Sequence, residues 1–310
     1  MKAVVLHAFG KSDVLQYEEA PMPQPAAGEV CIRVRAAGVN PFDWKIRQGA
    51  VEKQVPHQLP LILGWDAAGD IAAVGGGVTA FAVGDPVYVM ANPARNGAYA
   101  EFLVVDAALV APKPASLDYV AAASVPLAGE TAMQATYDAG QVAAGQTVLI
   151  HGGAGSVGGF AVQLAKARGA RVIATASAAD LAYVRELGAD QVIDFQHEQF
   201  EAIVRDVDMV LDTQGGDTQA KSWQVLRPAG VLVSTVQPPT PPAGAPSGVR
   251  GVMLESKPSG DTLRALSALV ETGQLKTLVQ QVLPLSQARQ AHDLLEGGHG
   301  GRGKVVLEIA

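Results

Sequence analysis

The arrangement of apolar and polar positions changes character near residue 116. Before it, short runs rich in Val, Ile and Tyr alternate with Gly- and Pro-containing turns. Closely spaced strands of this kind predict a barrel- or sandwich-like β domain. The predicted strands are Lys2–His7, Glu29–Ala36, Ala67–Val74, Pro86–Ala91 and Tyr99–Val105.

Beyond residue 116 the pattern becomes helical and then alternates between strand and helix. Ser116 offers an N-cap for a helix through Ala123, and Gly129–Tyr137 predicts a second helix that ends at Gly140. The alternation that begins at Gln146 is typical of a parallel sheet covered on both faces. Its predicted strands are Thr147–His151, Arg171–Ala176, Gln191–Asp194, Met209–Asp212 and Val231–Val236. Its predicted helices are Ser156–Arg168, Asp180–Leu187, Phe200–Val204 and Asp217–Leu226.

The last part of the chain is too short to form a domain of its own. A Pro- and Gly-rich segment, Gln237–Gly251, predicts a loop. It is followed by predicted helices at Asp261–Glu271 and Ser286–Glu296 and by a strand at Lys304–Ile309. We therefore expect an α/β fold of two domains. One is a β domain over residues 1–120, completed by 260–310, and the other is a parallel-sheet domain over residues 121–259.

A glycine-rich turn joins the first predicted strand of the parallel sheet to its first helix. Gly153-x-Gly155-x-x-Gly158 has the spacing of a dinucleotide-binding fingerprint. Such glycines allow a tight turn, close approach of backbone N–H groups to a pyrophosphate, and close helix–strand packing. The anion then lies at a helix N-terminus. The predicted pyrophosphate-binding residues are Gly153, Ala154, Gly155, Ser156, Val157 and Gly158.

Composition and charge limit the partners. The 310 residues are 48% apolar and 17% charged, with a net charge of −7, so a nucleic-acid partner is not expected. No apolar run reaches the length of a membrane span, and the apolar N-terminal run is too short for a signal peptide. Cys31 is the single cysteine, which excludes an internal disulfide. These features predict a cytoplasmic protein that does not enter a membrane.

The end of the second parallel strand indicates which dinucleotide binds. NAD-binding units place an acidic residue there for the ribose 2′-hydroxyl, whereas this chain has Thr175, Ala176 and Ser177. Their lack of charge favours NADP(H), and we predict that all three line the cofactor. No Lys or Arg is adjacent to pair with the 2′-phosphate. Arg302 is either the missing cation or an ordinary surface arginine, and we interpret Asp180 as a helix-start acid.

Several ordered blocks resemble the medium-chain dehydrogenase/reductase superfamily, in its zinc-independent quinone oxidoreductase-like branch. The blocks are Ala37–Asp43, Leu63–Gly69, Phe81–Val87, Gly97–Phe102, the glycine fingerprint, Leu187–Asp190 and Gly303–Leu307. The resemblance implies a GroES-like β domain built from both chain ends and a Rossmann domain with a doubly wound parallel sheet. It also implies a cofactor cleft at their junction and a homodimer.

The chain departs from the zinc-dependent branch at the metal ligands. Asn40 stands where that branch has a ligand Cys, and Trp65-Asp66 stands where it has His-Glu. An amide and an indole do not replace thiolate and imidazole as zinc ligands. The segment Ala91–Gly97 has no Cys where relatives carry a four-cysteine structural lobe. We therefore expect no metal.

The resemblance also suggests the catalytic residues. Asn40 and Lys45 lie in a motif like that of the alkenal/enone reductases, since quinone reductases have Tyr where Lys45 stands. An amide or an ammonium near the substrate carbonyl stabilises the enolate that forms on hydride addition, and Lys45 can also supply the proton. The alternatives are a turn role for Asn40, which precedes proline, and a solvated position for Lys45.

Four further cofactor contacts follow from the resemblance alone. Thr131 corresponds to a helix position that faces the nicotinamide, although it can equally cap its own helix. Phe195 corresponds to an aromatic residue that flanks the 2′-phosphate. Thr213 is expected on the adenosine side, and Val236 near the nicotinamide.

The predicted function is NADPH-dependent, zinc-independent reduction of quinones or α,β-unsaturated carbonyls (enones and enals) by hydride transfer. One alternative is a catalytically idle nucleotide-binding member with a structural, regulatory or RNA-binding role. The other is a zinc-dependent alcohol dehydrogenase, which Asn40 and Trp65 disfavour. Fold alone does not choose among them, because function depends on the site.

Overall fold

The computed structural model describes residues 1–298 and 301–310, which divide into two compact units. The β-rich unit comprises Met1–Leu127, Pro258–Thr272 and Thr277–Ala310. The parallel-sheet unit comprises Ala128–Lys257 and Gly273–Lys276. The sequence analysis places its domain boundaries at 120/121 and 259/260 and does not assign Gly273–Lys276 to the parallel-sheet domain.

The β-rich unit is built on a sheet in the order β15-β16-β3-β5-β6-β8, with β7 also pairing with β3. A second sheet has the order β2-β1-β4. The strands are β1 Lys2–Leu6, β2 Leu15–Glu19, β3 Glu29–Val39, β4 Leu61–Ile62, β5 Asp66–Val74, β6 Pro86–Met90, β7 Phe102–Asp106, β8 Val110–Pro112, β15 Val279–Pro284 and β16 Lys304–Glu308. The helices are α1 Pro41–Arg47, α2 Tyr119–Ala123, α8 Gly260–Glu271 and α9 Ala288–Glu296.

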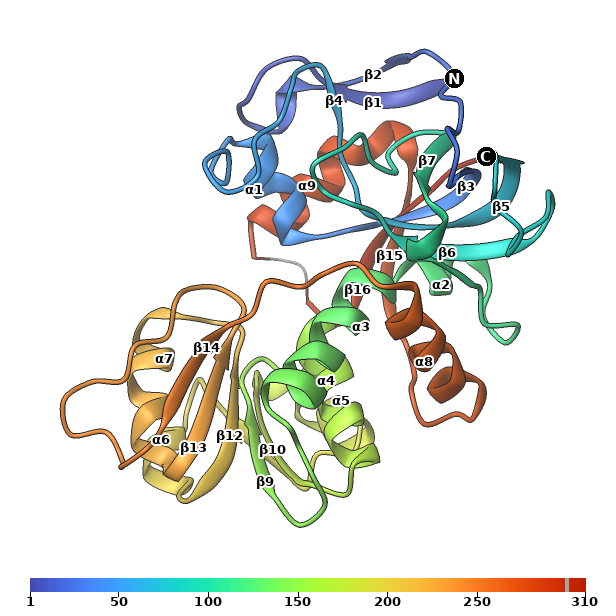
Figure 1. Cartoon of the computed structure of the whole chain (residues 1–310). Helices are drawn as coiled ribbons and strands as arrows, with labels where there is room; N and C mark the ends of the chain where they lie inside the picture. The colour runs from blue at the N-terminus through green and yellow to red at the C-terminus, as the bar shows by residue number, and fades with distance from the viewer. Residues whose placement is uncertain (299–300) are drawn as a thin grey trace. The chain divides into compact units, whose positions relative to one another are not determined.

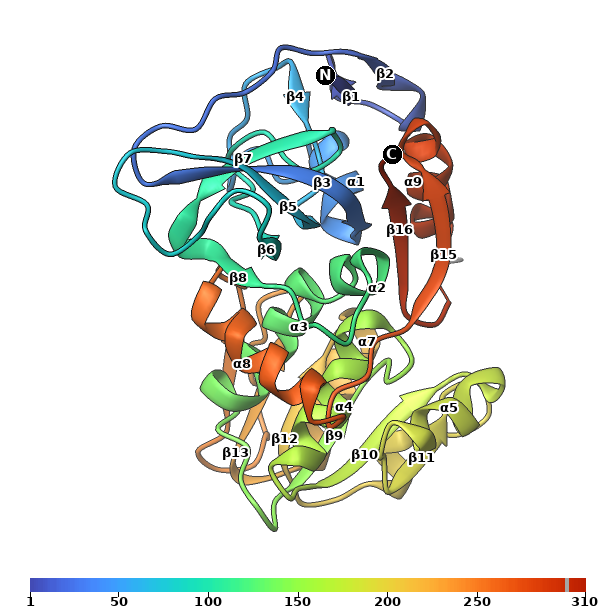
Figure 2. The same cartoon turned by 90° about the vertical axis from the view of Figure 1, so that its right-hand side faces the viewer.

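The two ends of the chain meet in this unit. The C-terminal strand β16 pairs antiparallel with β3, with Val305 opposite Val39, and β15 then adds to β16 in parallel (Figure 2). The sequence pattern does not reveal β15, because the polar Gln281 lies on the less exposed side of this edge strand and the apolar Val282 on its exposed side. Alternation of apolar and polar residues marks a strand only where one face is buried.

The parallel-sheet unit contains a sheet in the order β11-β10-β9-β12-β13-β14, in which every adjacent pair is parallel. Helices lie on both of its faces, as Figure 1 shows. The strands are β9 Thr147–Ile150, β10 Arg171–Ala176, β11 Gln191–Asp194, β12 Val207–Asp212, β13 Leu226–Ser234 and β14 Arg250–Met253. The helices are α4 Ser156–Ala167, α5 Leu181–Glu186, α6 Phe200–Ile203 and α7 Gly216–Ser222. The predicted α/β class with a doubly wound parallel sheet is confirmed.

Helix α3, Pro126–Met133, leads into the parallel-sheet unit and continues as a π-helical segment, Gln134–Ala139. The predicted loop Gln237–Gly251 is irregular up to Arg250, where β14 begins as an edge strand.

The side-chain amide of one residue, Gln163, attaches the short segment Gly273–Lys276 to this unit. Gln163 of α4 donates to the Lys276 carbonyl at 3.0 Å and accepts from the Lys276 N–H at 2.7 Å.

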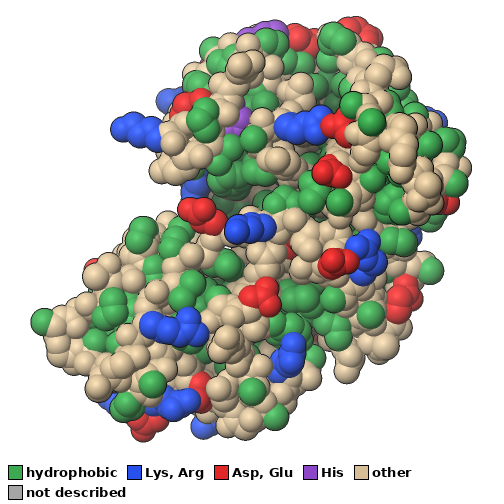
Figure 3. All heavy atoms as spheres, viewed as in Figure 1, with side chains coloured by type: hydrophobic (Ala, Val, Ile, Leu, Met, Phe, Trp, Pro, Cys, Tyr) green, Lys and Arg blue, Asp and Glu red, His purple; other side chains and the backbone are tan. Residues whose placement is uncertain are grey.

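The described part of the chain can be compared with what the sequence predicts about membrane spans and about the distribution of charge. Within it, no helix is both long and apolar enough to cross a membrane. On the face shown in Figure 3, Lys and Arg side chains are interspersed with Asp and Glu rather than gathered by sign.

Tyr99 is fully buried in the core of the β-rich unit, and its ring packs against Gly64. Gly64 has φ +87°, and a Cβ there would lie 2.2 Å from the Tyr99 ring. Position 64 therefore needs glycine both for its left-handed backbone and for the space.

Replacing Gly64 by Ala is expected to lower the free energy of unfolding by about 3 kcal/mol or more, because backbone strain and overpacking add. Gly28→Ala is the matched control, since Gly28 has φ +82° with nothing within 4 Å of the added Cβ. That variant is expected to lose only about 1–2 kcal/mol. Urea denaturation measures both, and equal losses would contradict the packing role of Gly64.

Candidate functional site

The glycine turn between β9 and α4 has two glycines that the fold itself requires. A Cβ at Gly158 would lie 2.1 Å from the Gly152 carbonyl oxygen, and one at Gly153 would lie 2.9 Å from the Ala174 Cβ. Gly155 is different, because the Gly152 carbonyl oxygen, at 3.4 Å, is the single neighbour that its Cβ would meet within 4 Å. The space beside Gly155 is therefore open.

This open space lies at the N-terminus of α4. Gly155 is the N-cap residue, and Ser156, Val157 and Gly158 form the first turn, which contains no acidic residue. The N–H groups of a first helical turn have no carbonyl partner within the helix, and the helix dipole adds positive potential there. Open space, free donors and the missing acid together fit the pyrophosphate of a dinucleotide.

A buried carboxylate holds the loops at the carboxyl ends of β12 and β13. Asp212 is fully buried, and its Oδ1 accepts from the N–H groups of Gln214 at 2.9 Å and Gly215 at 2.8 Å. Its Oδ2 accepts from Gln219 Nε2 and from Ser234 Oγ, both at 2.9 Å. Three of these donors lie in the turn after β12 and in α7, and the fourth ends β13, so Asp212 joins that turn to the end of β13. The sequence analysis placed Asp212 at the end of a strand, beside the segment expected on the adenosine side, and did not predict these contacts.

The predicted cofactor residues Thr175 and Thr213 use their hydroxyl groups to support the glycine turn. Thr175 Oγ1 accepts from the Gly152 N–H at 3.1 Å. Thr213 Oγ1 donates to the His151 carbonyl at 2.9 Å. Both residues thus lie at the carboxyl edge of the sheet, beside the glycine turn, and their contact with the cofactor stays a prediction.

The region predicted to hold the ribose brings Ala176, Ser177 and Phe195 together. The Phe195 N–H donates to the Ala176 carbonyl at 3.2 Å, and the Phe195 side chain is 59% exposed. The Ser177 hydroxyl donates to Asp180 Oδ2 at 2.6 Å. Asp180 thus does more than begin a helix, and Ser177 has no hydroxyl hydrogen left for a phosphate in this arrangement.

The other predicted cofactor contacts are placed as follows. Val236 follows β13, is 37% exposed, and its N–H donates to Ser234 Oγ at 3.3 Å. Thr131 is buried in α3. Arg302 is exposed and belongs to the β-rich unit, just before β16. The roles of these three residues stay predictions.

In the β-rich unit, the predicted catalytic residue Asn40 belongs to a buried polar cluster. Its Nδ2 donates to Asp66 Oδ2 at 3.0 Å, and its Oδ1 accepts from the Lys304 ammonium. Lys304 Nζ also lies 2.7 Å from Asp66 Oδ2. The second oxygen of Asp66 accepts from the Leu127 N–H at 2.6 Å. The sequence analysis missed Lys304, whose one signal is a charged residue at the start of an apolar strand.

A second chain of contacts begins at Asp43, in the first turn of α1. Asp43 Oδ2 accepts from the Asn40 N–H at 2.8 Å and from the Tyr99 hydroxyl at 2.6 Å. Burial, assisted by the nearby charge of Asp66, raises the pKa of Asp43 to about 7, against these two hydrogen bonds and the nearby Lys304.

The chain continues to helix α9. Tyr99 Oη lies 3.3 Å from His292 Nε2, and Arg47 Nη1 lies 3.2 Å from His292 Nδ1. Arg47 Nη2 then pairs with Glu296 at 2.5 Å. Burial, assisted by the nearby Arg47 guanidinium, lowers the pKa of His292 to about 3. These contacts attach α1, the helix that carries Lys45, to α9.

Lys45 itself makes few contacts. Its side chain is half-buried, and its Nζ lies 5.9 Å from the centroid of the Trp44 ring. Within residues 1–298 and 301–310, no ion pair or side-chain hydrogen bond is found for its ammonium. An unpaired ammonium remains able to bind a ligand.

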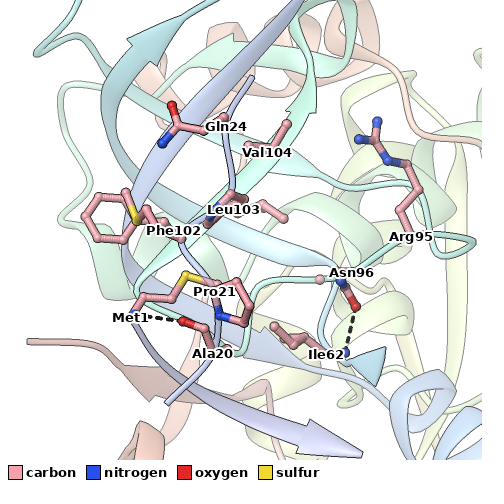
Figure 4. Close-up of a pocket in the computed structure, with 13 residues that line it drawn as sticks. Met1, Ala20, Pro21, Gln24, Ile62, Arg95, Asn96, Phe102, Leu103 and Val104 are labelled. Carbon is pink, nitrogen blue, oxygen red and sulfur yellow. Dashed lines mark hydrogen bonds between the residues drawn. The ribbon is translucent and has the colours of Figure 1, made fainter. Parts of the chain in front are cut away.

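A separate cavity of about 350 Å³ opens on the β-rich unit (Figure 4). Met1, Pro21, Phe102 and Leu103 give it an apolar lining, while Arg95 points away from the other labelled side chains. None of the predicted site residues lines it. Among the described residues, no group of three or more His, Cys, Asp and Glu side chains is placed to hold a metal ion.

Comparison with known proteins identifies the family. Residues 26–115 match the alcohol dehydrogenase GroES-like domain, and residues 187–307 match a family model described as zinc-binding dehydrogenase. The quinone oxidoreductase from Coxiella burnetii is 34% identical, with a TM-score of 0.90, and the match covers 100% of this chain and 99% of that one. This chain belongs to the medium-chain dehydrogenase/reductase superfamily, in its quinone oxidoreductase-like branch.

The names of two other proteins similar to this chain mention NADPH. The chloroplastic NADPH-dependent alkenal/one oxidoreductase of Arabidopsis thaliana is 36% identical over 318 residues, covering 99% of this chain and 79% of that protein. The Escherichia coli quinone oxidoreductase, solved as a complex with NADPH, is 28% identical with a TM-score of 0.88. That match covers 99% of this chain and 100% of the solved one. The predicted pairing of a GroES-like domain with a Rossmann domain is therefore confirmed.

Gly155→Ala is expected to weaken NADPH binding at least about tenfold, because the new methyl group occupies the space beside the first turn of α4. The fold itself has room for this methyl group, and the backbone is not left-handed there, with φ −70°. Loss of a glycine N-cap should therefore cost less than about 1 kcal/mol of stability. Fluorescence titration with NADPH and thermal unfolding separate the two effects. Unchanged affinity would exclude close approach of the cofactor to Gly155.

His151 makes the stability of the protein depend on pH. The imidazole is buried between Ser222 Oγ at 2.9 Å and Thr175 Oγ1 at 3.3 Å, and burial lowers its pKa to about 4 from 6.5. The unfolded chain therefore binds the proton more tightly than the folded protein does. The stability contributed by neutral His151 is present above pH 6.5 and is lost as the pH falls toward 4, by up to about 1.4 kcal/mol per pH unit.

Urea unfolding of the wild-type protein and of His151→Gln between about pH 6.5 and about pH 4.5 measures this contribution. The variant is expected to lose stability less steeply than the wild type over this range, because glutamine does not titrate. Parallel pH profiles would show that His151 does not titrate between the folded and unfolded states as described.

Proposed function

We propose that this protein is an NADPH-dependent reductase of quinones or α,β-unsaturated carbonyl compounds. The observation that carries the proposal is the open space beside Gly155 at the start of α4, in a chain of the quinone oxidoreductase-like branch. The names of its relatives, which include an NADPH-dependent alkenal/one oxidoreductase and a quinone oxidoreductase, support this substrate class.

NADPH supplies a hydride for transfer to the electrophilic carbon of the substrate when it is bound. The first turn of α4 would hold its pyrophosphate, and the turns fixed by Asp212 would contact the rest of the dinucleotide. Asn40 and Lys45 are proposed to act on the substrate. Lys45 carries an unpaired ammonium, which can stabilise the negative charge that develops on the carbonyl oxygen and can then supply a proton.

We further propose that the reaction proceeds without zinc, in a cytoplasmic homodimer. Asn40 and Trp65, where relatives have zinc ligands, support the first point. The single cysteine fits a reducing compartment. β14 ends the parallel sheet and has β13 as its one partner strand within the described residues, so its other edge can pair with a second copy. The zinc-dependent alcohol dehydrogenase is less favoured despite the match of residues 187–307 to a model described as zinc-binding dehydrogenase, because Asn40 and Trp65 do not offer the ligands that zinc prefers. The idle nucleotide-binding protein is less favoured because the named relatives are oxidoreductases.

Steady-state NADPH oxidation with a panel of quinones, enones and enals tests the proposal. Turnover of at least one class is expected, and Lys45→Met should lower kcat on that substrate about 100-fold because the charge and the proton donor are both removed. Lys11→Met, at an exposed position of the β-rich unit, is the matched control and should retain wild-type kcat. NADPH binding without turnover of any panel compound would refute the reductase function.

A further inference from the structure

Three polar side chains that lie far apart in the sequence meet at one level of the β-rich sheet. Asn40 follows β3, Asp66 begins β5, and Lys304 begins β16. The pairing of the strands explains their meeting, because Gly38 lies opposite both Asp66 and Val306. Gly38 also provides the room, since a Cβ there would lie 2.8 Å from Asp66 Oδ2. The exposed fractions of the three polar residues are 2%, 0% and 3%, so the cluster is shielded from solvent.

The contacts of Asn40 determine which way its amide group faces. Its Oδ1 accepts from the Lys304 ammonium, and its Nδ2 donates to the Asp66 carboxylate at 3.0 Å. A flipped amide would place two donors against each other at Lys304 and two acceptors against each other at Asp66. In a buried site such contacts are strongly unfavourable. The ion pair therefore permits one orientation of the Asn40 side chain.

This orientation leaves one donor unused. A side-chain amide has two N–H bonds, and Asp66 accepts one of them. For the second N–H of Asn40 Nδ2 no acceptor is found in the described ranges 1–298 and 301–310. Because the amide oxygen is bound to a cation, the amide is polarised and its free N–H becomes a stronger donor. The opposite charges of Asp66 and Lys304 cancel, so the cluster does not repel an anion.

We propose that Asp66 and Lys304 are a positioning pair for the reaction. They hold the Asn40 amide so that its second N–H is directed to the oxyanion that forms on the carbonyl oxygen of the substrate. The two charged residues act through Asn40 and do not touch the substrate themselves. This inference rests on the proposed reductase function, since it needs a substrate whose oxygen gains negative charge.

Removal of both charges tests the proposal with the least risk to folding. Lys304→Met alone leaves a buried, unpaired carboxylate, whereas the double variant Lys304→Met/Asp66→Asn removes the two charges together. The amide oxygen introduced by Asp66→Asn can still accept from the Leu127 N–H. The matched control is Arg35→Met/Asp70→Asn, which removes an ion pair of 2.9 Å between the same strands β3 and β5 without contacting Asn40.

In the wild-type background, the Lys304/Asp66 double variant is expected to lower kcat on an enone about 10- to 100-fold. The dissociation constant for NADPH should stay within about twofold of the wild-type value, as should kcat of the Arg35/Asp70 control. In an Asn40→Ala background the same Lys304/Asp66 change should alter kcat less than about twofold, because the amide that the pair orients is gone. Lys304→Arg should retain most of the activity, since it keeps the charge.

The cycle separates a positioning role from a structural one. A double variant with wild-type kcat, or losses that multiply with that of Asn40→Ala, would overturn the proposal. If the wild-type protein reduces no panel compound, the reductase function fails, and the inference, which needs that reaction, falls with it. Activity of the wild type together with an additive cycle would overturn the inference alone.

The orientation of the amide can also be followed without turnover. The ¹⁵N–¹H signals of the Asn40 side chain are assigned by their loss in Asn40→Leu. In the wild type, one of the two protons, the one donated to buried Asp66, should exchange with solvent slowly. The Lys304/Asp66 double variant should lose this protection, and equal exchange in the two proteins would contradict the proposal.

Discussion

The β-rich unit depends on one buried carboxylate, that of Asp66. Its oxygens accept from Asn40, from Lys304 and from the Leu127 N–H. Asn40 follows β3, Lys304 begins the last strand, β16, and Leu127 lies at the start of α3. A fully buried carboxylate without such partners is too costly to keep ionised. The three donors are therefore as necessary to Asp66 as it is to them. The contacts of Asp66 and the pairing of β16 with β3 together hold the C-terminal strand against the N-terminal part of the unit.

The parallel-sheet unit repeats this arrangement with Asp212. Here too a fully buried carboxylate accepts from several donors, and it adds side-chain contacts between the turn that follows β12 and the end of the paired strand β13. The carboxylate lies at the end of a strand, where parallel sheets bind ligands. Rigid loops at that edge lose little entropy when a dinucleotide binds. A buried carboxylate without partners costs stability, whereas the Asp212 carboxylate, with its four donors, fixes the loops and so favours cofactor binding.

The sequence predicted what is set by local rules. The Gly153–Gly158 turn could be recognised because the spacing of its glycines is that of a dinucleotide-binding fingerprint, and the central strands because they are continuously apolar. β15 was missed because its apolar residues do not follow its buried face, since Gln281 lies on the less exposed side and Val282 on the exposed one. The partners of Asn40 were missed for another reason, since the contact with Lys304 spans most of the chain and follows from strand register. Ser177 shows a different limit, because its hydroxyl donates to Asp180 three residues later, a local side-chain contact that the sequence pattern does not reveal.

The register of strands β3, β5 and β16 also gives a physical argument for the proposal that the reaction proceeds without zinc. The Asn40 oxygen, the atom that stands where relatives have a thiolate ligand, already faces the ammonium of Lys304. A divalent ion at this oxygen would have to displace a buried charge and leave it unpaired, which is expensive in a site shielded from water. Trp65 adds to this, because its fully buried indole offers no lone pair to a metal.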